Sequence, residues 1–212
     1  LLIDSVYIAS NITFDNLAPL STYLGKPGNP ALGGVPFAEY CARQAQHHKA
    51  EVAALLDTAH FIRRATDLYG YCNFICDTSG SICEVVDPGD PHDPVLTALS
   101  QNLLMVWIEG SEAHRDALIA RFDRAPKPMY YQPAFLDQVW AGFLEKQGCD
   151  EASVNPDAFL RYGYARLLAH RQPRYAAMSR WGVSVTADEV ALVKTPDDFN
   201  ALIARAIGRK RG

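Results

Sequence analysis

One stretch constrains the fold more than any other: an apolar segment that runs directly into a small polar turn. Residues 72–76 are mostly apolar, residues 77–81 read Asp-Thr-Ser-Gly-Ser, and residues 82–86 can begin a helix. This order predicts a buried strand, a tight turn and a helix. Ligands of open α/β sheets gather outside the carboxyl ends of the strands, so the turn is a candidate site. The alternative is that Asp77 and Ser81 only cap a turn.

A second unit of the same kind follows along the chain. Residues 103–108 form a continuous apolar run, and Ser111 is placed to cap a helix over residues 112–122. A last short strand is expected at Val183–Val185, before a closing helix capped by Thr195. Repeated strand, turn and helix units predict an α/β fold. We therefore expect a three-layer, doubly wound and mainly parallel sheet, flanked by helices and carrying a helical lid or insertion.

The remaining segments have helical periodicity. Apolar residues repeat at helical spacing over residues 36–56, 58–68, 133–148 and 155–171, and Pro173 is expected to break the last of these helices. A short strand is expected at Val6–Ala9. With 212 residues, the chain predicts one domain over residues 1–212, in which residues 129–172 form the helical insertion.

Composition excludes several classes of protein. The formal net charge is −4 with mixed signs, which argues against a nucleic-acid partner. No stretch approaches the roughly 18 consecutive apolar residues of a membrane span. The five cysteines are odd in number and lie mostly among apolar residues, as is typical of reduced thiols in a cytoplasmic protein. The adjacent His47 and His48 are expected to be solvated or interface residues.

A cationic cluster follows the helix at residues 112–122. Arg121, Arg124 and Lys127 lie at the end of this helix and in the proline-containing loop after it. Arginines in such a position can bind phosphate through two parallel hydrogen bonds. The alternative is that Arg121 and Arg124 only complement the negative end of the helix dipole.

Together these segments resemble a known family. The turn at residues 74–81, the strand at 103–108 with its helix ending at Arg121, the loop 124–128 and the sequence Arg-Gln-Pro-Arg-Tyr at 171–175 follow one another as in the C-terminal two thirds of small P-loop kinases of the shikimate-kinase type. The whole chain also resembles uncharacterised bacterial proteins labelled ATPase. It departs from the kinases in three ways: its turn has less glycine, its insertion at 129–160 is longer, and no Gly-x-x-x-x-Gly-Lys-Ser/Thr sequence occurs.

The resemblance implies an ATPase or a small-molecule kinase that acts on the γ-phosphate of ATP with Mg²⁺ and an unidentified small acceptor bearing an alcohol group. The first strand and its phosphate-binding loop would then precede Leu1. On this hypothesis Asp77 would hold the Mg²⁺ shell or orient the attacking group, and Arg121 and Arg124 would neutralise phosphate charge. The remaining implied contacts are with the acceptor, from Thr78, Ser79, Gly80 and Ser81, and with the nucleotide, from Lys127, Arg171 and Arg174.

Two other interpretations remain open. The helices at 36–56 and 133–171 could form the assembly surface of a non-catalytic interaction module, in which Asp77 is purely structural. Asp77 could instead be the nucleophile of a different phosphotransferase. Such enzymes usually carry Asp-x-Asp at the strand end, and Ser79 occupies the second position here, which disfavours that interpretation.

Overall fold

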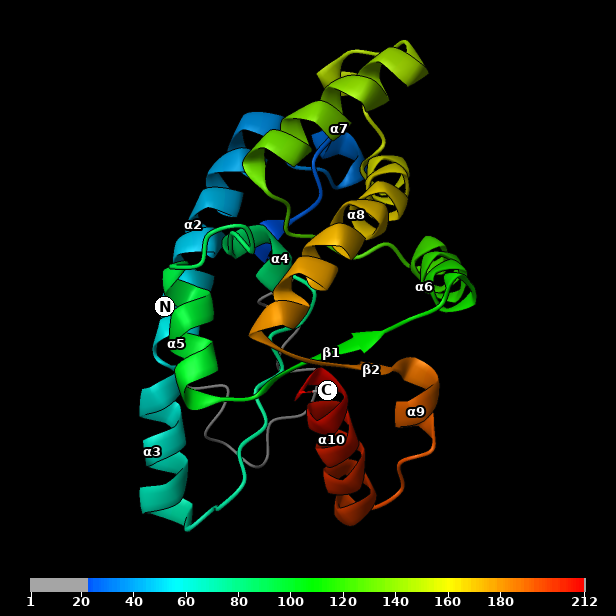
Figure 1. The fold of residues 1–212 in the computed structure, drawn as a ribbon. Helices are drawn as coiled ribbons and strands as arrows, with labels where there is room; N and C mark the ends of the chain where they lie inside the picture. The colour runs from blue at the N-terminus through cyan, green and yellow to red at the C-terminus, as the bar shows by residue number, and fades with distance from the viewer. Residues whose placement is uncertain (1–22, 212) are drawn as a thin grey trace.

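The computed structural model describes residues 23–211, which are mostly helical (Figure 1). The strand expected at Val6–Ala9 lies outside these residues. Within residues 23–211, no helix is long and apolar enough to cross a membrane.

The sheet of the described residues has two parallel strands, β1 (Met105–Glu109) and β2 (Gly182–Thr186). They pair in register from Met105 opposite Gly182 to Glu109 opposite Thr186. Both strands were expected from the sequence, and both are confirmed. In Figure 1 the pair lies between α8 above and α10 below.

The expected three-layer, mainly parallel sheet is wrong, because helices and only two strands make up the described chain. Residues 73–78 form neither helix nor strand, and Ile75 is 88% exposed. An extended segment becomes a strand only where a neighbour takes up its backbone N–H and C=O groups. The expected strand at 72–76 is therefore an unpaired connection, and it runs from α3 to α4.

The largest core lies between three long helices. These are α2 (Phe37–Leu56), α7 (Pro133–Gln147) and α8 (Pro156–Met178). Asn155 caps α8 by accepting a hydrogen bond from Ala158 N at 2.9 Å. Aromatic and aliphatic side chains fill the space between the helices, the largest fully buried ones being Tyr40, Tyr131, Phe159, Leu136, Leu160 and Leu167. Helices from the expected insertion thus form the main core together with α2.

The sequence prediction that Pro173 breaks a helix is wrong, because α8 continues through it to Met178. Proline removes one backbone hydrogen bond and strains the preceding turn. Side chains on either side of Pro173 hold α8 to the segment around α4, since Arg171 pairs with Glu84 and Arg174 donates to the carbonyl of Cys83. Tertiary contacts therefore override the local preference.

A second core joins two shorter helices, α4 (Ile82–Val85) and α5 (Pro94–Asn102), to α2 and α8. Its buried members include Leu55, Ile82, Leu96, Leu99 and Met178. Helix α3 (Thr58–Tyr69) contacts α2 and α5. Helix α5 begins where its proline-rich sequence indicates, because Asp93 accepts a hydrogen bond from Leu96 N at 2.8 Å.

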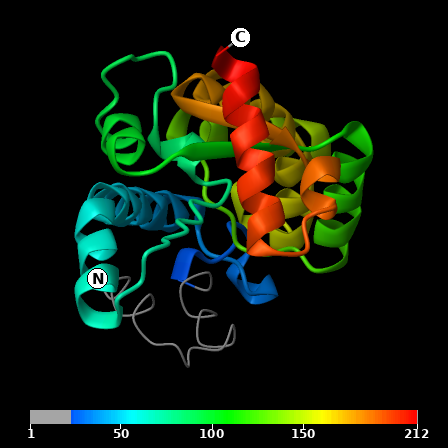
Figure 2. The same ribbon diagram turned by 60° about the horizontal axis from the view of Figure 1, so that its bottom comes forward.

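The third core lies between the sheet and the C-terminal helices. Helix α10 (Pro196–Arg211) packs on β2 through Val183, Val185 and Leu202, and it crosses the front of the sheet in Figure 2. Helix α9 (Ala187–Ala191) connects the two. Helix α6 (Glu112–Arg124) follows β1 and begins at the expected cap, Ser111. Three short 3-10 turns complete the described elements: η3 (Pro30–Leu32), η4 (Glu151–Ser153) and η5 (Ser179–Trp181).

Candidate functional site

An open cleft of about 1360 Å³ separates the 77–80 turn from the sheet and from α6 and α10. Its apolar lining residues include Leu103, which follows α5, and Met105 and Trp107 of β1. Its polar lining residues include Ser111 and His114 at the start of α6. The cleft therefore combines apolar surface with polar groups, as small-molecule sites commonly do.

The candidate residues divide between this cleft and the protein interior. The lining residues include Asp77, Thr78, Ser79 and Gly80 from the turn, and Arg121 and Arg124 from α6. The structure thus brings together, across one cleft, two groups that lie more than 40 positions apart in the sequence. The candidates that do not line the cleft are Ser81, Lys127, Arg171 and Arg174.

The turn is held by its own polar side chains. Asp77 Oδ1 accepts a hydrogen bond from Ser79 N at 2.9 Å, and Ser79 Oγ accepts one from Ser81 N at 3.2 Å. Ser79 has φ of +51°, a left-handed conformation that is uncommon for a residue with a side chain. Such backbone strain is often found at functional sites. Asp77 is exposed and uses only one carboxylate oxygen in this contact, so the other remains accessible.

Two arginines that line the cleft have no hydrogen-bonding or ion-pair partner in the described chain. Arg121 and Arg124 lie in the last turn of α6, and both are exposed. Within residues 23–211, neither guanidinium group makes a hydrogen bond or an ion pair. The helix between them is fixed, because Phe122 stacks on Tyr164 with 3.8 Å between ring centroids. The cleft thus has two uncompensated positive charges on a rigid element.

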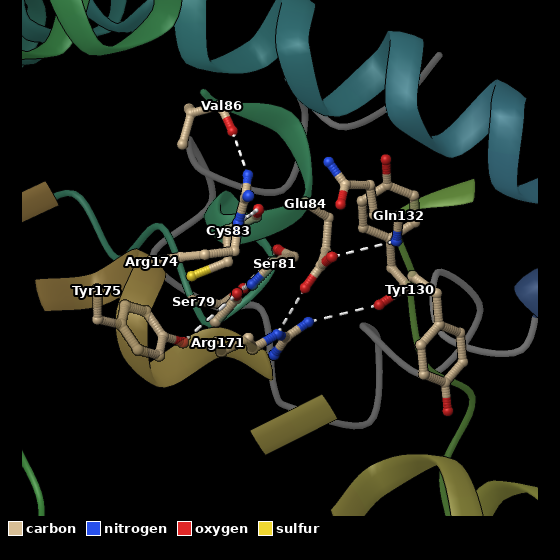
Figure 3. A network of polar contacts seen from close by, with 12 residues as sticks. Ser79, Ser81, Cys83, Glu84, Val86, Tyr130, Gln132, Arg171, Arg174 and Tyr175 are labelled. Carbon is tan, nitrogen blue, oxygen red and sulfur yellow. Dashed lines mark hydrogen bonds and ion pairs between the residues drawn. The ribbon is translucent and has the colours of Figure 1, made fainter. Parts of the chain in front are cut away.

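Arg171 occupies a different environment, in the interior. Its Nε donates to Glu84 Oε1 at 2.7 Å, and the side chains of Arg171 and Glu84 are 6% and 0% exposed. Glu84 Oε2 also accepts from Gln132 N at 3.1 Å, and Figure 3 shows the arginine between Glu84 and Tyr130. A buried charge needs such a partner. Arg171 therefore connects α8 with α4 and with the segment before α7.

Arg174 also binds protein groups. Its Nε donates to the carbonyl oxygen of Cys83 at 2.8 Å and its Nη2 to that of Val86 at 2.6 Å, so it satisfies carbonyls at the end of α4 (Figure 3). Arg174 therefore stabilises the end of α4. They also hold in place the helix that follows the 77–81 turn.

Gly80 is required by this arrangement for steric reasons. A Cβ atom on Gly80 would lie 2.5 Å from Arg171 Nη1 and 2.8 Å from the Tyr175 hydroxyl. The turn thus lies directly against the buried arginine. Although Arg171 does not line the cleft, it sets the position of a residue that does.

The sequence interpretation missed Glu51 of α2, which contacts the turn, and its neighbour His47. Ser81 Oγ donates a hydrogen bond to Glu51 Oε1, and Ser81 Oγ lies 2.7 Å from Ser79 Oγ. His47 Nε2 lies 3.2 Å from Glu51 Oε2, one helical turn away. The spacing of four residues between His47 and Glu51 was a signal of this pair. Nothing in the sequence indicated its contact with the turn.

The chemistry of the remaining groups limits what the site can hold. Among the described residues, no group of three or more His, Cys, Asp or Glu side chains could bind a metal ion. Mg²⁺ is commonly held by one or two carboxylates together with substrate phosphates, so Asp77 fits Mg²⁺ only when a phosphate ligand accompanies it. Burial raises the pKa of the Cys83 thiol to about 12 and also raises that of Cys76, so both thiols are protonated and unreactive near neutral pH.

Comparison with known proteins adds no assignment. No protein-family model matches the chain, no curated protein matches it, and no solved structure matches it.

Proposed function

We propose that the cleft binds the phosphate groups of a nucleotide, ATP with Mg²⁺, as one half of a phosphoryl-transfer site. The observation that carries this proposal is the pair of unpartnered arginines, Arg121 and Arg124, in the lining of a cleft that also includes the Asp77–Gly80 turn. The uncharged part of the nucleotide can pack on the apolar side chains that line the cleft.

The proposal assigns each polar group of the cleft a role in binding or in phosphoryl transfer. Arg121 and Arg124 donate charge-assisted hydrogen bonds to phosphate oxygens and stabilise the charge that develops there during transfer. Asp77 holds Mg²⁺ through its accessible carboxylate oxygen, and phosphate oxygens complete the shell. Thr78 and Ser79 provide hydroxyl groups in the lining of the cleft. Phosphoryl transfer depends mainly on positioning and electrostatics, which these groups supply.

A complete site needs a backbone cradle for the phosphates, and no Gly-x-x-x-x-Gly-Lys-Ser/Thr sequence occurs in residues 1–212. The edge of β1 away from β2 has no strand beside it in the described chain. Without such a sequence the chain should bind ATP weakly, with a Kd of about 1 mM or above, roughly −4 kcal/mol.

Titration calorimetry with up to 10 mM ATP and Mg²⁺ tests the proposal. Each charged hydrogen bond contributes about 1.5–3 kcal/mol, so Arg121→Gln combined with Arg124→Gln should weaken binding at least tenfold. Lys127→Gln is the matched control, because Lys127 is a nearby exposed cation that does not line the cleft. Equal heats from the wild-type protein and the double variant would contradict the proposal.

A second function, a non-catalytic interaction module, is supported by the apolar surface beside the free edge of β1. Leu104 and Ile108 are about half exposed there, and Ile75 lies across the same cleft. An unpaired strand edge with apolar neighbours favours the addition of another strand. Analytical ultracentrifugation separates the two functions, because self-association that Ile108→Lys abolishes, without any effect of ATP, would favour the interaction module.

A further inference from the structure

A series of hydrogen-bonded side chains connects the cleft with helix α2. Ser79 lines the cleft, whereas Ser81, Glu51 and His47 do not. Ser79 Oγ lies 2.7 Å from Ser81 Oγ, and Ser81 Oγ in turn contacts Glu51 Oε1 (Figure 3 shows the two serines). The series joins a hydroxyl group in the cleft to a carboxylate on α2.

The hydrogen bonds of this series have one direction. An ionised carboxylate only accepts hydrogen bonds, so the single hydroxyl proton of Ser81 is directed to Glu51. Ser79 must then be the donor to Ser81 over the 2.7 Å contact. Ser79 Oγ also accepts from Ser81 N, which uses one of its two lone pairs. The other lone pair has no partner in the described chain.

The carboxylate at the end of the series has one oxygen without a hydrogen bond. The side chain of Glu51 is 14% exposed. Its Oε2 is buried without a hydrogen bond, since His47 Nε2 lies 3.2 Å away but outside hydrogen-bonding geometry. Glu51 therefore keeps unused hydrogen-bond acceptor capacity at this oxygen.

We propose that Glu51, acting through Ser81, is the proton acceptor that activates the Ser79 hydroxyl as a nucleophile toward phosphorus. Ser79 Oγ forms a bond to phosphorus, and the bond between phosphorus and the leaving group breaks, with its electron pair departing on the leaving group. The Ser79 proton moves to Ser81 as the Ser81 proton moves to Glu51. That the natural electrophile is the γ-phosphate of ATP, with the diphosphate as leaving group, rests on the proposed function; the relay itself does not.

Diisopropyl fluorophosphate tests the relay on the chain as it stands, without a nucleotide. Attack by Ser79 Oγ forms an O–P bond and releases fluoride, and mass spectrometry of the digested protein locates the adduct. We expect one adduct, at Ser79. Proton transfer to a positioned base contributes about 10²- to 10⁴-fold, so Glu51→Gln should slow the labelling at least a hundredfold.

Three variants distinguish proton acceptance by Glu51 from a merely structural contact between Glu51 and the turn. Glu51→Gln keeps an oxygen that can accept the Ser81 hydrogen bond, so it preserves the turn but removes the base. Ser81→Ala interrupts the series and should slow labelling similarly. Glu39→Gln makes the same chemical change at an exposed position of α2 and should label at the wild-type rate.

Two results would overturn the relay: no adduct at Ser79, or equal labelling rates for wild type and Glu51→Gln when circular dichroism shows both folded. Labelling does not depend on Arg121 or Arg124. Failure of ATP binding with intact, Glu51-dependent labelling would thus refute the proposed nucleotide and leave the relay standing.

Discussion

The buried pair of Glu84 and Arg171 should contribute more to stability than any surface ion pair of this protein. In the Glu84→Ala variant, Arg171 would remain 5% exposed, with only the Tyr130 carbonyl at 3.4 Å near its guanidinium group. Gln132 N would also lose its acceptor. The variant therefore leaves a buried charge and a buried backbone donor without their main partner.

The expected loss follows from this geometry. Removing one partner of a buried ion pair costs about 3–5 kcal/mol, because the other charge stays buried and uncompensated. A domain of this kind has a total stability of about 5–15 kcal/mol, so Glu84→Ala should remove a large fraction of it. Replacing both partners, as in Glu84→Leu with Arg171→Met, should recover part of the loss, since no isolated charge remains.

Urea unfolding followed by circular dichroism at 25 °C measures this loss. The control is Glu39→Ala, which breaks the exposed pair between Glu39 and Arg43 and should cost about 0–1 kcal/mol. A cost below about 1 kcal/mol for Glu84→Ala, or a double variant less stable than both single variants, would refute the reasoning.

Three further predictions concern the turn and two helix caps. Gly80→Ala should destabilise by about 1–3 kcal/mol in the same urea assay, because its Cβ meets the fixed Arg171, whereas Gly208→Ala on open helix surface should stabilise by up to about 1 kcal/mol. Ser111→Ala removes the cap of α6 and should cost about 1 kcal/mol by thermal unfolding. Hydrogen bonds at the start of α10 lower the pKa of Asp198 below its ordinary value of 3.8, so its stabilising effect is present above that pH and is lost as the pH falls through the lowered pKa. Asp198→Asn should therefore make stability less dependent on pH below about 4, and an unchanged acid titration would count against this cap.

Local patterns predicted much of the helical structure. The apolar spacing in α2 and α7 and the cap at Ser111 are all determined by residues within a few positions of one another. Both paired strands were also predicted, because continuous apolar runs of that length favour buried strands. The sequence of such segments alone contains enough information to identify them.

The features that sequence reasoning missed depend on distant partners. Residues 72–76 have the composition of a strand, but pairing requires a neighbour that the described chain does not provide. The motif around Arg171 suggested a nucleotide contact, and its local spacing could not reveal a buried partner 87 positions away at Glu84. Glu51 went unnoticed for the same reason, since it meets Ser81 across 30 positions.

The central claim is that the 77–81 turn and the end of α6 bind one phosphate-bearing ligand together. Hydrogen–deuterium exchange with and without 10 mM ATP and Mg²⁺ tests it most directly, because it reports the response of each segment separately. The account predicts slower exchange at residues 77–81 and at 121–124, and no such change in the Arg121→Gln, Arg124→Gln variant. Unchanged exchange at both segments, or slower exchange only elsewhere in the chain, would contradict it.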